Sequence, residues 1–184
     1  MTLSDRDIKA ALELGELVIT PLAEGAIQPT SVDLTLSRWF RKFVGKDPID
    51  TSKPLNMADW PEFEVPEGEP LWAEPWQFYL GSTVERLTID ANTSATVTGK
   101  SSPGRLAVIV HYTAGHTEAG FDGTITLEMM NQLPVPQTIW PGKSYAQVVL
   151  TRTISPAEHP YAGKYQNQDG PKVSEYWRNF KEAK

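Results

Sequence analysis

The chain has 184 residues, the usual length of one domain, and we expect residues 1–184 to fold as a single unit. It carries 17 Lys and Arg against 23 Asp and Glu. The resulting formal net charge of −6 argues against nucleic-acid partners, which require a basic surface. There is no cysteine, which excludes disulfides, cysteine-ligated metal sites and a cysteine nucleophile.

The N-terminal segment has no apolar run suited to a signal peptide. No stretch approaches the roughly 18 consecutive apolar residues of a membrane-spanning helix. We therefore expect no membrane partner and a cytoplasmic location, which would be the host cytoplasm if the source is a virus.

Residues 1–20 are predicted to form an N-terminal helical arm. Ser4 suits the N-cap position, and Asp7, three residues later, suits the return partner of a capping box. Apolar residues then recur at helical spacing, and Gly15 is a typical helix stop. The pattern indicates a helix that docks on the rest of the domain.

The chain beyond this arm predicts a mainly β fold. Val32, Leu34 and Leu36 alternate with polar residues, as in a strand with one buried face. Further strands are expected at residues 77–80, 84–89, 95–98, 106–111, 124–130 and 145–151, of which 106–111 would be buried on both faces. The expected architecture is a β-barrel or jelly-roll-like sandwich with an N-terminal helix.

Two segments are expected to be irregular. Residues 45–75 are rich in Pro, Asp, Glu and Trp and lack periodicity, which indicates an insertion. Trp60 and Trp72 within it and Trp76 directly after it would cover a core edge or a partner subunit, although they also suit a sugar-stacking surface. Residues 155–184 are polar and are expected to form a flexible C-terminal tail.

A short basic turn at residues 99–105 is a candidate phosphate site. It places Lys100, Ser101, Ser102 and Arg105 between two predicted strands. Hydroxyls, backbone N–H groups and an arginine fork suit phosphate oxygens. The spacing of a P-loop is absent, so a solvated turn remains the alternative.

A glycine-rich segment at residues 113–123 is expected to join two strands as a hairpin-like connection. Glu118 is a candidate acid there, and Phe121 suits either a stacking platform for a base or sugar or a core anchor. His111, at the end of a predicted buried strand, is expected to be a core histidine with its hydrogen bonds satisfied. The scattered histidines match no metal-binding pattern.

Glu128 interrupts the apolar strand predicted at residues 124–130. A carboxylate desolvated by large apolar neighbours is poised to exchange a proton near neutral pH, which suits a general acid or base. The alternative is that Glu128 faces solvent on an edge strand. Alternation alone does not decide between the two.

Together these segments resemble the dCTP deaminase family, which shares a trimeric β fold with the dUTPases. The resemblance covers nearly the whole chain and rests on stretches in the family's order. They are residues 3–8, 27–33, 99–105, 111–115 with 123–128, and 155–170. It implies a dUTPase-like fold with an N-terminal helix and a C-terminal lid.

The resemblance also implies an activity, the hydrolytic deamination of the cytosine of dCTP to dUTP and ammonia. Glu128 would be the general base and acid toward a water that attacks C4, with Ser101 and Arg105 as catalytic partners. The implied substrate-binding residues are Lys100, Ser101, Ser102, Arg105, Ala114, Glu118, Phe121, Thr126, Leu127, Gln147, Tyr161, Lys164 and Gln168. Mg²⁺ would be carried by the triphosphate and not by a protein metal site. The implied assembly is a homotrimer with sites shared between chains, and dTTP is a possible inhibitor.

Two features bear on whether the reaction continues to dUMP and pyrophosphate, which would supply dUMP for thymidylate synthesis. Residues 113–115 with Phe121 resemble the bifunctional members that take dCTP to dUMP. Glu118 stands where the family usually has Asp, and Pro103-Gly104 stand where it usually has Leu-Ala. The alternatives are a dUTPase without deaminase activity, a nucleotide-binding regulatory protein that has lost catalysis, and a carbohydrate-binding sandwich.

Overall fold

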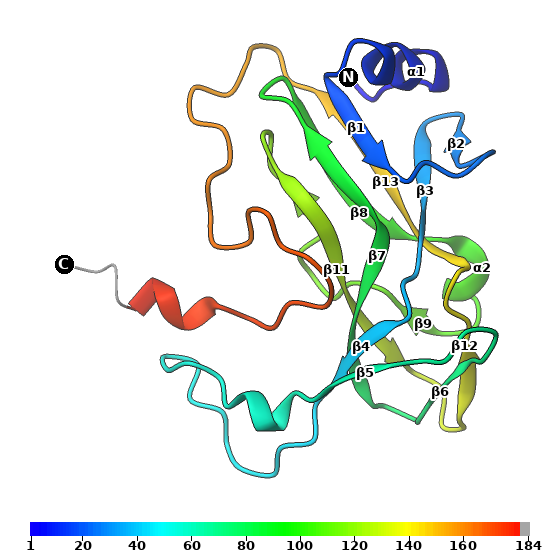
Figure 1. Cartoon of the computed structure of the whole chain (residues 1–184), viewed down its shortest axis with the longest axis vertical. Helices are drawn as coiled ribbons and strands as arrows, with labels where there is room; N and C mark the ends of the chain where they lie inside the picture. The colour runs from blue at the N-terminus through cyan, green and yellow to red at the C-terminus, as the bar shows by residue number, and fades with distance from the viewer. Residues whose placement is uncertain (181–184) are drawn as a thin grey trace.

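The computed structural model describes residues 1–180, in which two β-sheets enclose one core and a helix lies across one end (Figure 1). In chain order the elements are α1 (Asp5–Glu13), β1 (Leu17–Thr20), β2 (Ile27–Gln28), β3 (Ser31–Thr35), β4 (Trp39–Lys42), η1 (Met57–Asp59), β5 (Glu62–Glu64), β6 (Leu71–Ala73), β7 (Phe78–Ile89), β8 (Thr93–Gly99), α2 (Ser101–Gly104), β9 (Val108–Ile109), β10 (His116–Thr117), β11 (Asp122–Asn131), β12 (Gln137–Ile139), β13 (Ser144–Arg152) and η2 (Tyr176–Phe180). The mainly β fold with an N-terminal helix is confirmed. Residues 181–184, the end of the predicted tail, lie outside the described residues.

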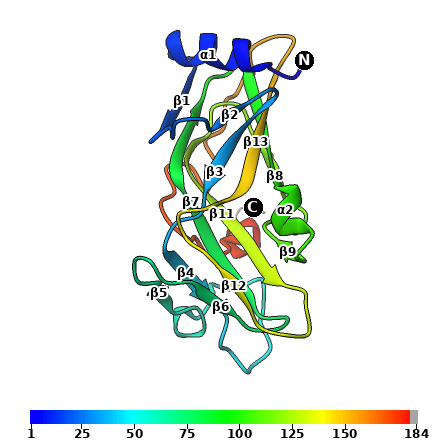
Figure 2. The same ribbon diagram turned by 90° about the vertical axis from the view of Figure 1, so that its right-hand side faces the viewer.

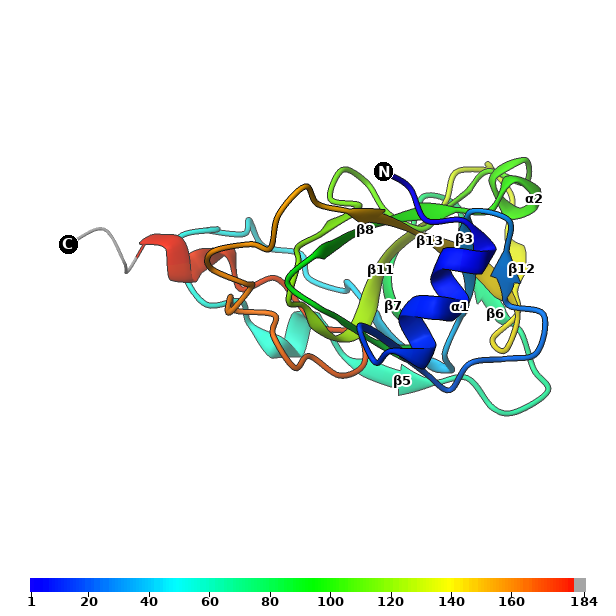
Figure 3. The same ribbon diagram turned by 90° about the horizontal axis from the view of Figure 1, so that it is seen from above.

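The strands pair antiparallel in two main sheets. The larger sheet has the order β5-β4-β7-β11-β9, with β1 also paired to β7, and the second has the order β10-β8-β13-β3-β2. Strands β6 and β12 form a separate pair. Figures 2 and 3 show the sheets wrapping around a common interior with α1 across one end, so the core is closed on that side.

Alternating side chains set the register of β11 at the centre of the larger sheet. Leu127 and Met129 are fully buried in the core, while Thr126 and Glu128 point to the opposite face and are half-buried. Burying a side chain of this size contributes about 1.5–3 kcal/mol. A one-residue slip would lose that burial, so packing of the apolar face fixes where Glu128 points.

Helix α1 is capped where the sequence predicts, but residues 17–20 of the expected helical arm form strand β1. The Ser4 Oγ accepts a hydrogen bond from the Asp7 N–H at 3.4 Å, and the Asp7 carboxylate accepts one from the Ser4 N–H at 3.0 Å. The helix ends at Glu13, and Gly15 follows with a φ of +71°. Ile8 is buried against the sheets, which confirms the docking helix.

Strand β7 is continuous, so the prediction of two strands at residues 77–80 and 84–89 is wrong. Gly81 lies at the expected break, yet it does not turn the chain. A Cβ at Gly81 would lie 3.0 Å from the Met129 sulfur and 3.2 Å from Leu36 and Phe40. The glycine therefore lets the strand run close to the core.

The prediction of a buried strand at residues 106–111 is also wrong, because only Val108–Ile109 forms a strand, β9. The turn that contains α2 continues into this segment, with the Leu106 N–H donating to the Pro103 carbonyl at 2.9 Å. Ala107 then takes a φ of +57°. Leu106 is 61% exposed, so the apolar run is not buried on both faces.

Residues 113–123 do not form the expected hairpin-like connection. Strand β9 pairs with β11 in the larger sheet, but β10 pairs with β8 in the second sheet. The chain therefore crosses from one sheet to the other and back before β11 begins. This crossing places β10 beside the polar face of β11.

The insertion at residues 45–75 is not irregular throughout, because it contains η1, β5 and β6. Trp60 packs against Phe43 at a centroid distance of 5.0 Å and meets Phe78 edge-on at 6.1 Å. Trp72 and Trp76 are 63% and 60% exposed. Because Trp60 is packed among aromatic rings, the three tryptophans do not make the single exposed surface that a carbohydrate-binding sandwich requires.

The predicted C-terminal tail is docked on the domain along residues 161–174. Gln168 bridges to Gly123 alongside β11, and the Asn167 N–H donates to the Asp122 carbonyl at 2.7 Å. Pro171 is buried. Figure 1 shows this segment returning along β11 before η2 projects away from the sheets. No helix within residues 1–180 is long and apolar enough to cross a membrane.

Candidate active site

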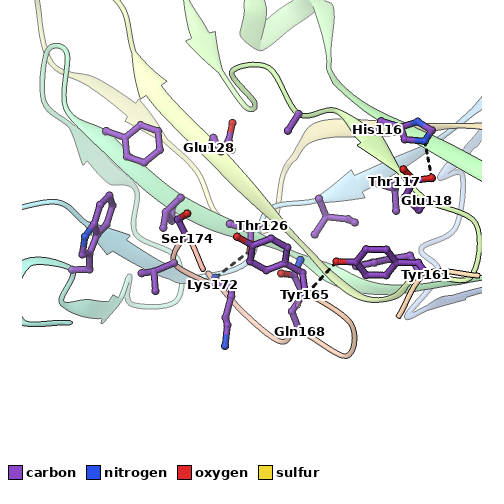
Figure 4. Close-up of a pocket in the computed structure, with 17 residues that line it drawn as sticks. His116, Thr117, Glu118, Thr126, Glu128, Tyr161, Tyr165, Gln168, Lys172 and Ser174 are labelled. Carbon is purple, nitrogen blue, oxygen red and sulfur yellow. Dashed lines mark hydrogen bonds and ion pairs between the residues drawn. The ribbon is translucent and has the colours of Figure 1, made fainter. Parts of the chain in front are cut away.

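A cavity of about 520 Å³ opens between β11, the segment around β10 and the C-terminal tail (Figure 4). This volume lies within the usual range of small-molecule sites. Seven predicted site residues line it: Ala114, Glu118, Phe121, Thr126, Glu128, Tyr161 and Gln168. They come from three stretches that are separate in sequence, and the fold brings them together.

Glu128 lies at one end of this cavity. It sits opposite Leu80 across the β7–β11 ladder, so an apolar side chain is its neighbour on the same face. The Tyr112 N–H donates to its Oε2 at 2.8 Å. Strand β9 reaches β11 only at Met130 and Asn131, so at Glu128 the strand pairs with β7 alone and is an edge there. The carboxylate is half-buried and has one oxygen fixed by a backbone donor.

An aromatic wall flanks the Glu128 end of the cavity. Trp60 and Phe78 line the cavity, and Phe78 also contacts the Tyr112 ring at a centroid distance of 6.0 Å. Sequence reasoning did not assign these rings to the site. Trp60 lies far from the motifs in sequence, and its only sequence signal is a tryptophan in a polar insertion. The wall gives this end of the cavity an apolar surface suited to a planar base.

The other end of the cavity holds a second carboxylate. Figure 4 shows Glu118 beside His116, apart from Glu128. The His116 Nε2 lies 3.3 Å from the Glu118 Oε2. Phe121 is buried and packs on Tyr161 at a centroid distance of 6.0 Å, so it is both a core anchor and a wall of the site.

The docked tail forms the third side of the cavity. The Tyr161 hydroxyl accepts the Tyr165 N–H at 3.2 Å, and the Gln168 side-chain amide donates to the Thr124 carbonyl at 2.7 Å. The Lys172 N–H donates to the Thr126 hydroxyl at 3.1 Å. Tyr165 and residues 172–174 also line the cavity, although the sequence did not mark them.

Comparison with known proteins decides the family. A family model described as dCTP deaminase-like matches residues 2–153. The chain belongs to the dCTP deaminase-like family. A "dCTP deaminase, dUMP-forming" of Corynebacterium diphtheriae is 41% identical over 191 residues, covering 98% of this chain and 100% of the relative. Another of that name, from Nocardia farcinica, is 43% identical and covers 98% of this chain and 94% of the relative. The resemblance drawn from the motifs is thus confirmed.

Solved structures support the same fold. A 2′-deoxycytidine 5′-triphosphate deaminase from Agrobacterium tumefaciens matches 81% of this chain with a TM-score of 0.63 and 23% identity. The match covers 47% of that chain, so this chain spans about half its length. The native EIAV dUTPase matches with a TM-score of 0.50 and 15% identity, covering 80% and 98% of the two chains. The expected dUTPase-like fold is confirmed.

The basic turn of the dCTP deaminase-like motif lies away from this cavity. The residues that line the cavity include neither Lys100 nor the α2-turn residues Ser101, Ser102 and Arg105. In Figure 1, α2 and the C-terminal tail lie on opposite sides of the molecule. The three α2-turn side chains are exposed, whereas Lys100 forms an ion pair with Asp33. Within one chain, the predicted catalytic partners Ser101 and Arg105 therefore lie apart from Glu128.

Three further predicted binding residues also lie outside the cavity lining. Leu127 is fully buried in the core. The Gln147 amide donates to the Gly99 carbonyl and accepts from Ser31, next to the basic turn. Lys164 bonds to the Asn179 side chain. Their roles in binding stay predictions.

No group of three or more His, Asp or Glu side chains within residues 1–180 is placed to hold a metal ion. His111 is half-buried, and its Nδ1 has no hydrogen-bond partner among these residues. The prediction of a satisfied core histidine is therefore wrong. The shortened β9 leaves this ring beside Gly115 instead of inside a strand.

Proposed function

We propose that the protein is a dCTP deaminase that replaces the 4-amino group of the cytosine by oxygen. The observation that carries the proposal is the Glu128 carboxylate, held by the Tyr112 N–H at one end of a cavity with an apolar aromatic wall. The family membership and the names of the relatives support the same activity.

In the proposed mechanism Glu128 moves one proton. Tyr112 holds Oε2, which leaves Oε1 to take a proton from a water whose oxygen bonds to C4 of the cytosine. Glu128 then returns the proton to the 4-amino nitrogen as the C4–N bond breaks. The products are ammonia and, once the remaining hydroxyl proton has moved to N3, a C4 carbonyl. Leu80, its cross-strand partner, and Phe78 line the same cavity and give this end an apolar surface.

We further propose a homotrimer in which a neighbouring chain supplies the basic turn. Ser101 and Arg105 lie outside their own chain's cavity, and they are exposed. A neighbouring copy would bring them to Glu128, where they would hold the water and polarise the base. Lys100 and Ser102 would meet the triphosphate. A chain of net charge −6 needs such a local cationic group and triphosphate-bound Mg²⁺ to hold a polyanion.

The second proposed step is cleavage of dUTP to dUMP and pyrophosphate. The "dUMP-forming" names of relatives at 41% and 43% identity support it, as do residues 113–115 and Phe121. Glu118 stands where the family usually has Asp. Its extra methylene would place the carboxylate about 1.5 Å farther from the backbone. Its contact with His116 gives the longer side chain a support.

The test is to incubate the purified protein with dCTP and Mg²⁺ and to separate the nucleotides by ion exchange over time. Release of dUMP and ammonia is expected. A dUTP product that persists would remove the second step, and unchanged dCTP would refute the deaminase. Adding dUTP alone and dCTP with dTTP in parallel distinguishes a dUTPase and tests inhibition by dTTP.

The variant Glu128→Gln tests the assigned base. The amide oxygen preserves an acceptor for the Tyr112 N–H, so the variant keeps its fold and its nucleotide binding. Deamination is expected to fall by about 10²–10⁴-fold. Glu24→Gln, an exposed change of the same type, is the control and keeps full activity. Ammonia release by Glu128→Gln at the control's rate would refute the role.

A further inference from the structure

Arg41, on strand β4, connects two walls of the cavity although it does not line the cavity itself. Its Nε donates to the Pro171 carbonyl of the tail at 2.9 Å, and its Nη1 donates to the Trp60 carbonyl at 2.9 Å. Its Nη2 donates to the Glu62 Oε2 at 2.7 Å. The side chain is 20% exposed. Each nitrogen of this largely buried guanidinium therefore has a partner within the chain.

The register of the larger sheet places Arg41 in the same row as the proposed base. Arg41 pairs with Leu80 on β7, and Leu80 pairs with Glu128 on β11. Residues that pair across adjacent strands project to the same face of the sheet. Neighbouring strands lie about 4.8 Å apart, so the backbones at Arg41 and Glu128 are about 10 Å apart. Phe40, the residue before Arg41, is fully buried, as expected if Arg41 faces away from the core.

The two carbonyls belong to segments that are distant in sequence. Trp60 follows η1 in the insertion and lines the cavity. Pro171 is buried in the tail, and residues 172–174 line the same cavity. Figure 4 shows Ser174 on the Glu128 side of the cavity. The guanidinium therefore connects the tail to the aromatic wall at the end where the base would bind.

A guanidinium suits this connection better than other side chains do. Its nitrogens lie in one rigid plane, so two carbonyls that bind to it are held at a fixed spacing. A lysine ammonium is a point charge on a flexible stem and does not fix such a spacing. Directly after Pro171, the Lys172 N–H donates to the Thr126 Oγ1 at 3.1 Å. The position that Arg41 gives to Pro171 thus also determines how the tail meets β11, two residues before Glu128.

We propose that Arg41 is a positioning residue that fixes the spacing between the tail and the aromatic wall around the base of the nucleotide. This inference rests on the proposed function. The base must lie within reach of Glu128 and its water, and a misplacement of about 1 Å can lower a rate about 100-fold. The triphosphate would extend away from this end of the cavity. Loss of Arg41 should therefore slow the chemical step more than it weakens nucleotide binding.

Steady-state deamination of dCTP by the full-length protein with Mg²⁺ tests the proposal, with kcat and KM determined separately. Arg41→Ala removes all three hydrogen bonds, and Arg41→Lys keeps the charge without the planar guanidinium. Guanidinium chloride added to Arg41→Ala is the rescue, with sodium chloride at the same concentration as its control. Arg38→Ala is the matched control variant, because Arg38 lies just before β4 and forms ion pairs with Glu64 and Glu67 outside the cavity lining.

Arg41→Ala is expected to lower kcat by about 10- to 100-fold and to change KM by less than about threefold. Arg41→Lys should lower kcat by about three- to tenfold, and Arg38→Ala should leave it unchanged. Guanidinium, but not sodium, should raise the kcat of Arg41→Ala. Hydrogen exchange at the Lys172 amide should be faster in Arg41→Ala, whereas exchange at the Asn167 amide, which donates to Asp122, should not change.

A side chain that only stabilised the fold would give a different result. The melting temperature of Arg41→Ala would fall while the kcat of the folded protein and the exchange at Lys172 stayed at their unmodified values, and this would overturn the inference alone. A loss confined to KM would also overturn it. If Arg41→Ala does not fold, an unchanged kcat in Arg41→Lys has the same meaning. If the unmodified protein does not deaminate dCTP, the proposed function fails and the inference fails with it.

Discussion

The docked tail depends on a charged group at the start of β11, which makes the substitution Asp122→Asn informative. The Asp122 carboxylate accepts hydrogen bonds from Arg86 Nε and Nη2, both at 2.8 Å, and from the Thr88 hydroxyl at 2.7 Å. Asp122 also binds the tail, because its carbonyl accepts the Asn167 N–H at 2.7 Å. The Arg86 Nη2 that Asp122 holds also donates to the Asn167 Oδ1 at 3.1 Å, so removing the charge should weaken both β11 and the tail.

The expected loss in the free energy of unfolding depends on how exposed the Arg86 and Asp122 side chains are. Hydrogen bonds to charged groups contribute about 1.5–3 kcal/mol, whereas exposed ion pairs contribute about 0–1 kcal/mol. The Arg86 and Asp122 side chains are 40% and 27% exposed, which lies between these cases. Asparagine still accepts one of the bonds. We expect Asp122→Asn to lower the free energy of unfolding at pH 7 by about 1–2 kcal/mol.

The lowered pKa of Asp122 determines how the stability should change with pH. The Arg86 guanidinium holds the pKa of Asp122 below its usual value, and burial opposes this only in part. A depressed pKa in the folded state contributes stability that is present above the unfolded pKa of about 3.9 and is lost as pH falls through the folded pKa. The difference in the free energy of unfolding between Asp122→Asn and the unmodified protein should become smaller below about pH 4.

Urea unfolding at fixed protein concentration from pH 7 to pH 3 measures this gap. Hydrogen exchange at the Asn167 amide reports the tail separately and should be faster in Asp122→Asn. Asp47→Asn, an exposed change of equal charge, is the control. A gap that is constant with pH, or no larger than in the control, would show that the Arg86 contact does not stabilise the domain.

Two further substitutions test the walls of the site. Phe121→Ala removes a buried ring that packs on Tyr161, and should cost about 3–5 kcal/mol in urea unfolding; a loss below about 1 kcal/mol would contradict the assigned packing. Gly115→Ala would place a Cβ 2.6 Å from the Val97 carbonyl, so β10 must move from β8. We expect a lower melting temperature and weaker nucleotide binding, and unchanged values for both would contradict the close approach.

Periodicity predicted those parts of the fold that one buried face determines. The alternation in β3 and β11 and the capping box of α1 each depend on neighbours within a few residues, and the structure has them as expected. The errors occur where distant contacts decide. Gly81 is a close approach to Met129 and not a turn, and Leu106 is exposed because the α2 turn continues past it.

The candidate site divides in the same way. Residues marked by motifs on β11 and on the segments before and after it, such as Glu128 and Glu118, do line one cavity. Trp60 and Lys172 carry no local pattern, and they reach the cavity only because an insertion and a tail fold back onto the larger sheet. Predicting them requires the contacts between segments that are separated by many residues.

The separation of α2 from the cavity leads to a test of the whole assembly. If each site joins Glu128 of one chain to Ser101 and Arg105 of the next, two inactive variants can complement each other. Glu128→Gln and Arg105→Ala would be mixed in equal amounts, unfolded in urea and refolded together. About one site in four would then combine an intact Glu128 with an intact Arg105, provided the chains associate at random in a closed ring. Deaminase activity should rise from near zero to about a quarter of that of the unmodified protein. If the mixture stays as inactive as either variant alone while mixed oligomers are detected by mass spectrometry, Glu128 and Arg105 act within one chain and the shared site is refuted.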